Sequence, residues 1–198
     1  RRADGPGAAR AAGVIACRAV STPHEPAPAA LIIALLRAPH IARDEVHARL
    51  VRAFGPIAIA SGEYAFTLSS YYQPEMGAGL LREYLIFDHS VNPGALADIK
   101  LRTNALEQEW SSAGCRAVNL DPGLLTEHNL VLATGKDFAH RIYLRDGIYA
   151  EVTLRAHGGR LQPLPWTYPD YQLPATLEFF ETHRRRVRAA RRLHHTSA

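Results

Sequence analysis

The sequence predicts an α+β protein in which a ferredoxin-like βαββαβ unit is followed by an antiparallel β-meander and a C-terminal helix. Three observations lead to this fold class. The first half alternates apolar runs of strand length with two stretches of helical periodicity, in the order strand, helix, strand, strand, helix, strand. After Pro122 the pattern changes to short strands separated by tight turns. From about residue 174 the apolar spacing is helical again.

The first predicted strand is the continuous apolar run at 30–38, and a helix follows near 42–54, ended by Gly55 and Pro56. Residues 57–67 predict a second strand with a bulge near Gly62, and residues 80–88 predict a third. Together with the helix and the strand described next, these elements should form a four-stranded antiparallel sheet with both helices on one face.

The strongest helix signal covers residues 93–113. Asn92 is a good capping residue, Pro93 suits the first helical position, and Gly114 ends the segment. A fourth strand is expected at 115–121. The residues that we expect to be buried between the two helices and the sheet are Val46, Leu50, Phe54, Leu96, Ile99, Leu106 and Trp110.

Tight turns divide the second half of the chain. Asp146-Gly147 and Gly158-Gly159 are typical two-residue hairpin turns. They predict a meander of four strands and then a helix with Leu177, Phe180, Val187 and Leu193 on its apolar side. The expected strands are 130–134, 139–145, 148–157 and 160–166, and the expected helix is 174–193.

Composition excludes several classes of protein. The chain has 198 residues, 47% hydrophobic and 21% charged, which is unlike disordered, collagen-like or coiled-coil chains. The longest apolar run, 29–36, is far shorter than the ~20 residues of a membrane-spanning helix, so we expect no membrane partner. Cys17 and Cys115 have neither disulfide-framework nor metal-ligand spacing, which favours a reducing cytoplasm and predicts no metal site.

Charge is concentrated at the two ends of the chain. Residues 1–29 and 183–198 together hold ten arginines and two acidic residues, so they account for the net charge of +4 and leave a mildly acidic body. We expect a disordered arm at 1–29, a single α+β domain at 30–182, and an Arg-rich helix end and tail at 183–198, with the arginines from 184 onward exposed.

The meander contains the best candidate site. If Asp146-Gly147 is a two-residue turn, His140 and Glu151 lie diagonally on one sheet face, together with Tyr149. Trp166 should then lie opposite Glu151 across the next turn. The pair is either an oriented general base, with His140 and Glu151 as catalytic residues, or a structural ion pair.

Other polar residues could complete a pocket. Arg141 is expected on the opposite face from His140, either packed along the sheet edge or acting as an anion clamp. Asp121, in a turn that ends a strand, suits a metal or a hydroxyl group. The remaining candidate ligand-binding residues are Lys136, one of only two lysines, together with Tyr72 and Asp170.

Four blocks of the sequence carry a resemblance to a known family. They are SYYQPEMG (70–77), NLDPGLLT (119–126), ATGKDFAHRIYLRDGIYAEVTL (133–154) and LPWTYPDY (164–171). Over roughly residues 30–182 the chain resembles an uncharacterised prokaryotic family, domain-of-unknown-function family 4416. In that family the first block has Asp where this chain has Ser70, which would impair this copy if that Asp were catalytic.

The resemblance implies no established activity, although some relatives carry a GTP-binding label. The sequence argues against a P-loop, because Gly135-Lys136 is followed by Asp137 and no glycine stands five residues before it. No motif indicates a particular cofactor, and nothing indicates the oligomeric state.

Two hypotheses follow from these observations. The first is a pocket protein or enzyme that acts on a small anionic ligand, phosphorylated or nucleotide-like. The second is a non-enzymatic interaction or RNA-binding module that uses the Arg-rich C-terminal helix for nucleic acid. The acidic body favours the first.

Overall fold

A computed structural model describes residues 22–195, and side chains up to residue 187. Four α-helices are present in that part: α1 (Arg43–Phe54), α2 (Gln73–Met76), α3 (Leu96–Glu107) and α4 (Pro174–His195). The strands are β1 (Ala29–Arg37), β2 (Ile57–Ala60), β3 (Tyr64–Ala65), β4 (Leu81–Val91), β5 (Ser111–Ser112), β6 (Cys115–Arg116), β7 (Val118–Leu125), β8 (Asn129–Thr134), β9 (Ile142–Arg145), β10 (Ile148–His157) and β11 (Arg160–Pro163). The single-turn helices are η1 (Pro93–Ala95), η2 (Gln108–Trp110) and η3 (Pro169–Gln172).

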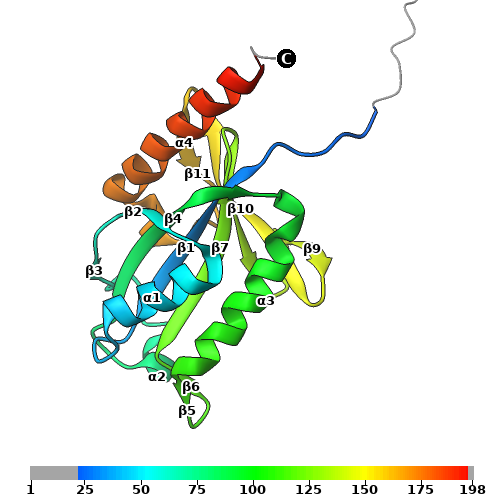
Figure 1. Cartoon of the computed structure of the whole chain (residues 1–198). Coiled ribbons are helices and arrows are strands. Elements are labelled where there is room, and N and C mark those ends of the chain that lie inside the picture. Colours follow the sequence, from blue (N-terminus) through cyan, green and yellow to red (C-terminus); the bar gives the residue numbers. More distant parts are fainter. Residues whose placement is uncertain (1–21, 196–198) are drawn as a thin grey trace, which may run out of the picture.

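Within the described residues, one mostly continuous antiparallel sheet organises the molecule (Figure 1). Its strand order is β11-β10-β8-β7-β1-β4-β2, with β3 added to β4 and β9 added to β10; β5 and β6 pair separately. The prediction of an α+β protein with a C-terminal helix is therefore confirmed. The meander continues the same sheet beyond β7 rather than forming a layer of its own.

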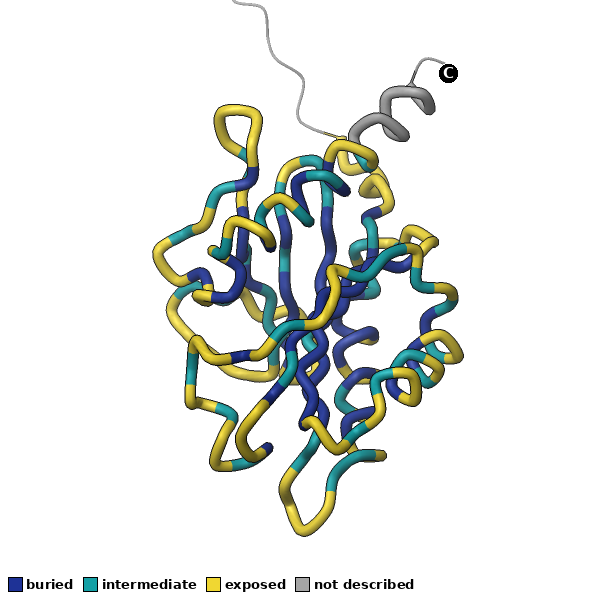
Figure 2. The backbone as a smooth tube through the Cα atoms, turned by 90° about the vertical axis from the view of Figure 1, so that its left-hand side faces the viewer, coloured by how far each residue is buried: buried dark blue, intermediate teal, exposed yellow. Residues whose placement is uncertain are grey.

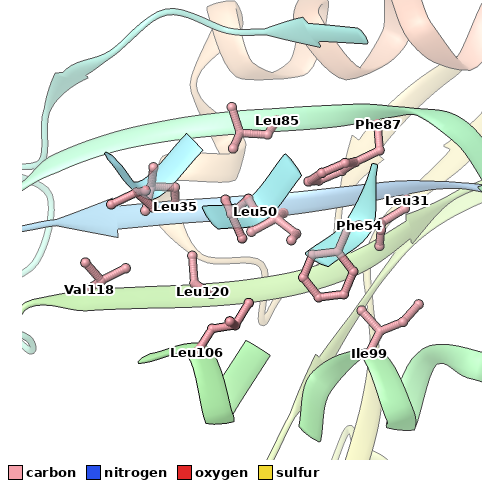
Figure 3. Packing of buried hydrophobic residues seen from close by; sticks show 12 residues of the cluster. Leu31, Leu35, Leu50, Phe54, Leu85, Phe87, Ile99, Leu106, Val118 and Leu120 are labelled. Atoms are coloured by element: carbon pink, nitrogen blue, oxygen red, sulfur yellow. The ribbon is translucent and has the colours of Figure 1, made fainter. Parts of the chain in front are cut away.

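Helices α1 and α3 cover one face of the central strands. Leu50 and Phe54 of α1, and Ile99 and Leu106 of α3, pack on alternate residues of β1, β4 and β7 (Figure 3). Six of the seven residues predicted to be buried here are buried. Trp110 is only partly buried, because its indole Nε1 donates a hydrogen bond to the exposed Glu45, 2.6 Å away.

The other face of the sheet packs against α4. Phe180 is fully buried, and its ring contacts those of Tyr84 on β4 and Tyr171 on η3. The buried segments run along the central strands, whereas most exposed segments are loops and outer helix turns (Figure 2). Both faces of the central strands are therefore covered, as the continuous apolar run of β1 predicts.

Several predicted boundaries are wrong. The second strand is interrupted at 61–63, and the fourth begins at Val118 and continues to Leu125. Strand β9 begins at Ile142 instead of 139, since a turn occupies 139–140, and β11 ends at Pro163 because the chain turns before Trp166. At 139–140 and at 165–166 a turn replaces the expected strand end, whereas the fourth strand continues through the segment where a turn was expected.

The predictions for the two ends are tested only in part. Residues 1–21 and 196–198 lie outside the described residues, while 22–28 are exposed and β1 begins at Ala29. Arg184 is buried, contrary to the prediction, because Glu181 and the carbonyl oxygens of Glu127 and Gly159 accept its hydrogen bonds. Arg185 and Arg186 are exposed as expected. In the part of the chain that the structure describes, every helix is too short or too polar to span a membrane.

Candidate functional site

The sheet opens between β7 and β8. These strands pair only where Gly123–Leu125 faces Leu130–Leu132, after which β8 continues along β10. The first half of β7 therefore has β1 on one side and no strand on the other. Helix α3 takes the place of that strand: Glu107 accepts a hydrogen bond from the Leu120 N–H (2.6 Å), and Lys100 donates one to the Leu120 carbonyl oxygen (2.9 Å).

The segment Asp121-Pro122-Gly123 fits this opening. We expected a turn here, but all three residues lie inside β7. Because backbone groups alternate sides along a strand, the backbone nitrogen of Pro122 faces the same open side as that of Leu120. No strand pairs with β7 on that side at Pro122, so the lack of an N–H at this proline costs no hydrogen bond of the sheet. A Cβ at Gly123 would come within 2.6 Å of the Val131 carbonyl oxygen, so glycine allows β8 to approach at the point where pairing begins.

Replacing Gly123 with alanine should therefore weaken the junction of β7 and β8. We expect a loss of about 1–3 kcal/mol in the free energy of unfolding, because the added Cβ meets backbone rather than a flexible side chain. Denaturant unfolding measures it. Gly135→Ala is the control, since a Cβ there has no neighbour within 4 Å. Equal stabilities of the two variants would contradict the close approach.

A cavity of about 960 Å³ occupies the opening. The strand register places Arg82, Asp121 and Glu151 on the face that packs against α4, and Lys100 and Glu107 reach the cavity from α3. Both lysines of the chain line it. The charged lining residues are Glu75, Arg82, Lys100, Glu107, Arg116, Asp121, Lys136, Glu151 and Asp170.

Most of these charges are paired within the wall. Arg116 bridges Glu75 and Glu107, each at 2.7 Å. Burial raises the pKa of Glu107 even though Lys100, Arg116 and the Leu120 N–H oppose it. Such a network stiffens the wall opposite Asp121.

Asp121 is an ionised carboxylate that is open to the cavity. It keeps 27% of its side chain accessible, accepts a hydrogen bond from Asn119 (2.7 Å) and lies 3.4 Å from Lys100. Burial acts to raise the pKa of Asp121, but Lys100, Arg82 and Asn119 outweigh it and hold the pKa below the usual value. Asp121 can therefore accept hydrogen bonds from a bound molecule.

Arg82 is a buried cation with unused donors. Its Nε lies 3.0 Å from Oδ2 of Asp170, and its guanidinium lies over the Phe66 ring. Nevertheless, Nε and Nη1 are buried and make no hydrogen bond to any described residue. Buried donors are rarely left unsatisfied, so this feature indicates a missing partner.

Glu151 is the centre of a second buried cluster. Its Oε2 accepts a hydrogen bond from Arg141 Nε (2.7 Å) and lies 3.2 Å from His140 Nε2. The His140 ring stacks on the Trp166 ring, with 5.1 Å between the ring centres. Its Oε1 is buried without a partner among the described residues. The predicted contact between His140 and Glu151 is thus present, and Glu151 forms part of the cavity wall.

Aromatic residues and Lys136 lie at the mouth. Lys136 donates a hydrogen bond to the Tyr71 hydroxyl and lies 4.4 Å from the centre of that ring. No carboxylate of the described residues pairs with Lys136. Tyr168 accepts a hydrogen bond from Arg141, and burial raises the pKa of Tyr72 far above its usual value, so Tyr72 stays protonated.

The predicted site residues separate into two groups. The cavity brings together Asp121, Lys136, Glu151, Tyr72 and Asp170. The residues that do not line it are His140, Arg141, Tyr149 and Trp166. Tyr149 packs against Tyr143, since a register shift in the β9–β10 hairpin breaks the expected pairing.

Arg141 does not lie on the opposite face from His140. Residues 140 and 141 precede β9, so strand alternation does not apply to them, and both side chains reach Glu151. Sequence reasoning also missed Arg82, Lys100, Glu107, Arg116 and Tyr171. The two charges of Arg82 and Glu83 inside an otherwise apolar strand, and the rarity of lysine, were the available signals.

Metal ligands are not grouped in the described part of the chain: no set of three or more His, Cys, Asp or Glu residues there could hold a metal ion.

The fold and the cavity define an α+β protein whose single main sheet opens around a polar internal site. The chain belongs to the family described as Domain of unknown function (DUF4416), whose model matches residues 27–187. That match confirms the family resemblance and extends slightly beyond the expected 30–182. A search of the curated proteins and a search of the solved structures each returned no match.

Proposed function

We propose that the cavity binds a small anionic ligand, phosphorylated or nucleotide-like. The observation that carries this proposal is the buried Arg82 guanidinium, whose Nη1 has no partner among the described residues. A guanidinium presents its donors in a planar arrangement that matches phosphate oxygens, and burial in a low dielectric strengthens the attraction. The pKa of Arg82 is raised despite burial, by Asp170 and the surrounding tyrosines, so the donors stay charged.

Lys136 supports the same proposal. The lining carboxylates each have a cationic partner, whereas the Lys136 ammonium has no carboxylate partner in the part of the chain that the structure describes and contacts the exposed Tyr71. An anion entering the mouth would meet this lysine first. The volume of about 960 Å³ is ample for a nucleotide or a sugar phosphate.

Lys136→Ala should weaken binding of a phosphorylated ligand about tenfold, because it removes an exposed charge–charge contact worth about 1 kcal/mol or slightly more. Isothermal titration with inorganic phosphate, pyrophosphate, ADP and glucose 6-phosphate measures it after a thermal-shift screen. Arg145→Ala is the control, since Arg145 pairs with Asp98 and Asp146 outside the cavity. The proposal fails if none of these compounds binds the wild-type protein.

A catalytic role for His140 and Glu151 as base and orienting group remains a hypothesis. It is supported by their contact and by the position of Glu151 in the wall. The alternative of a structural ion pair is supported by Arg141, which shares the same carboxylate oxygen. His140→Ala separates the two: loss of ligand-induced stabilisation favours a role in the site, and an unchanged response favours the structural role.

We also propose a ferredoxin-like unit for the fold and a cytoplasmic location for the protein. A ferredoxin-like unit is supported by the order β7-β1-β4-β2 of the first four long strands, with α1 and α3 on one face. A cytoplasmic location is supported by cysteines without disulfide spacing. Binding of nucleic acid by the Arg-rich helix stays the alternative function; of its described arginines, Arg184 is already engaged within the fold.

A further inference from the structure

We infer that Glu151 determines the specificity of the cavity by accepting a hydrogen bond from a hydroxyl group of the ligand, so that the ligand is a phosphorylated sugar. This inference rests on the proposed function, because it concerns the end of the ligand that Arg82 and Lys136 do not bind. Two buried glutamates of the same sheet, Glu83 and Glu151, differ in a way that supports this role.

Glu83 and Glu151 have the same kinds of partner. Their side chains are 1% and 2% accessible, and each contacts one arginine and one histidine. At Glu83 both carboxylate oxygens are used: Arg43 donates to both, and His47 contacts Oε2. At Glu151 both partners contact Oε2, and Oε1 has none in the described residues.

The difference follows from position. Glu83 lies outside the cavity lining, next to α1, whereas Glu151 forms part of the cavity wall. His140 and Arg141 are not lining residues, and both contact Oε2, so Oε1 is the carboxylate oxygen of this wall residue that is left without a partner among the described residues. A buried charged acceptor without a partner is costly, and a donor from a bound molecule would remove that cost.

A second unused group belongs to the same cavity. The Tyr171 hydroxyl is buried, lines the cavity and has no partner among the described residues, and burial raises its pKa well above the usual value. Tyr171 is therefore protonated, and its unpaired hydroxyl is able both to donate a hydrogen bond to a sugar hydroxyl and to accept one. Asp121 adds a further ionised acceptor on the same sheet face.

Charge balance favours a hydroxyl over an ammonium group. Arg141, Lys100 and Arg82 already neutralise Glu151, Asp121 and Asp170, one cation for each carboxylate. An additional cation in the ligand would be in excess, whereas a neutral hydroxyl supplies the missing donor without adding charge. Tyr168 and Tyr72 provide aromatic surface for the C–H groups of a sugar ring.

The test compares ligands that share a phosphate and differ in hydroxyl groups. Isothermal titration measures the binding of ribose 5-phosphate, glucose 6-phosphate and pentyl phosphate, which has no hydroxyl on its chain. We expect at least one sugar phosphate to bind wild-type protein at least about tenfold more tightly than pentyl phosphate, since buried groups built for a hydroxyl reject analogues that lack it. Glu151→Gln should reduce this ratio to below about threefold, because its amide oxygen faces the Arg141 donor and its NH₂ group replaces the acceptor Oε1.

Two further variants keep the test decisive. Glu83→Gln removes the same charge from the matched cluster and should leave the ratio unchanged. Tyr171→Phe removes only a hydroxyl, so it should fold even if Glu151→Gln does not, and it should lower the affinity for the sugar phosphate alone. Equal binding of sugar and alkyl phosphates by wild-type protein overturns the inference. If inorganic phosphate binds and no sugar phosphate does, the inference is overturned and the proposed function stands; if no phosphate compound binds, the proposed function fails first.

Discussion

Glu107→Ala is expected to lower the free energy of unfolding by about 3 kcal/mol, the lower end of the range for removing one partner from a buried ion pair. The carboxylate holds the unpaired edge of β7 through the Leu120 N–H and also binds Arg116. Its loss leaves a buried N–H without an acceptor, where no strand can replace it. Arg116 keeps Glu75 as a partner, which limits the loss.

The matched control lies two residues further along the chain. Glu109 is exposed and pairs with the partly exposed Arg49, so Glu109→Ala should leave stability within experimental error. Glu107→Gln keeps an acceptor for the Leu120 N–H and should recover part of the loss. Chemical denaturation of the three variants measures the differences, and equal effects of Glu107→Ala and Glu109→Ala would show that α3 does not support the strand edge.

Phe180→Ala is expected to cost about 3–5 kcal/mol, because it leaves a cavity where a fully buried ring packed. The ring connects α4 with Tyr84 in the sheet and with Tyr171 in the cavity wall. We therefore expect loss of ligand affinity as well as of stability.

Phe138→Ala provides the comparison for Phe180. The Phe138 side chain is 64% exposed, and the structure places its ring against His140 alone among aromatic neighbours in the described residues. Its removal should change the melting temperature little. Thermal unfolding of both variants, with and without phosphate ligands, measures the two effects, and an unchanged melting temperature for Phe180→Ala would contradict the role of α4.

The elements that the sequence predicts well are those with strong local signals. The apolar run of β1 lies where expected, and Asn92 caps the predicted helix as expected, at η1, because capping residues and apolar spacing act within a few positions of each other. The α-helix α3 covers only the middle of the predicted 93–113, since single turns occupy 93–95 and 108–110 and a short strand begins at Ser111. Boundaries near 115–118 and 139–142 were misplaced, since turns there depend on contacts with distant residues. The Gly158-Gly159 turn gave the correct register for β10 and β11, because nothing interrupts that hairpin.

The site was predicted less completely than the fold. The contact between His140 and Glu151 was expected from strand pairing, but it forms because residues 138–141 turn toward β10 before β9 begins. The cavity itself exists because β7 and β8 separate, and α3 forms one side of the opening between them. Glu107 has no local pattern that marks this role, and the rarity of lysine sets Lys100 apart without placing it in the cavity, so only the long-range arrangement brings the two residues to the site.

The position of β1 has a consequence for synthesis of the chain on the ribosome. This strand precedes both of its partners in the chain, since Ala30 pairs with Ser90 on one side and with Leu125 on the other. Its apolar side chains and the polar backbone groups of its two edges therefore stay uncovered until a large part of the polypeptide has been made. Contacts so distant in sequence slow folding, and an uncovered apolar strand readily associates with other chains. Nascent chains that stop before Leu125 should accordingly depend on chaperones, whereas chains that extend past it can close the sheet.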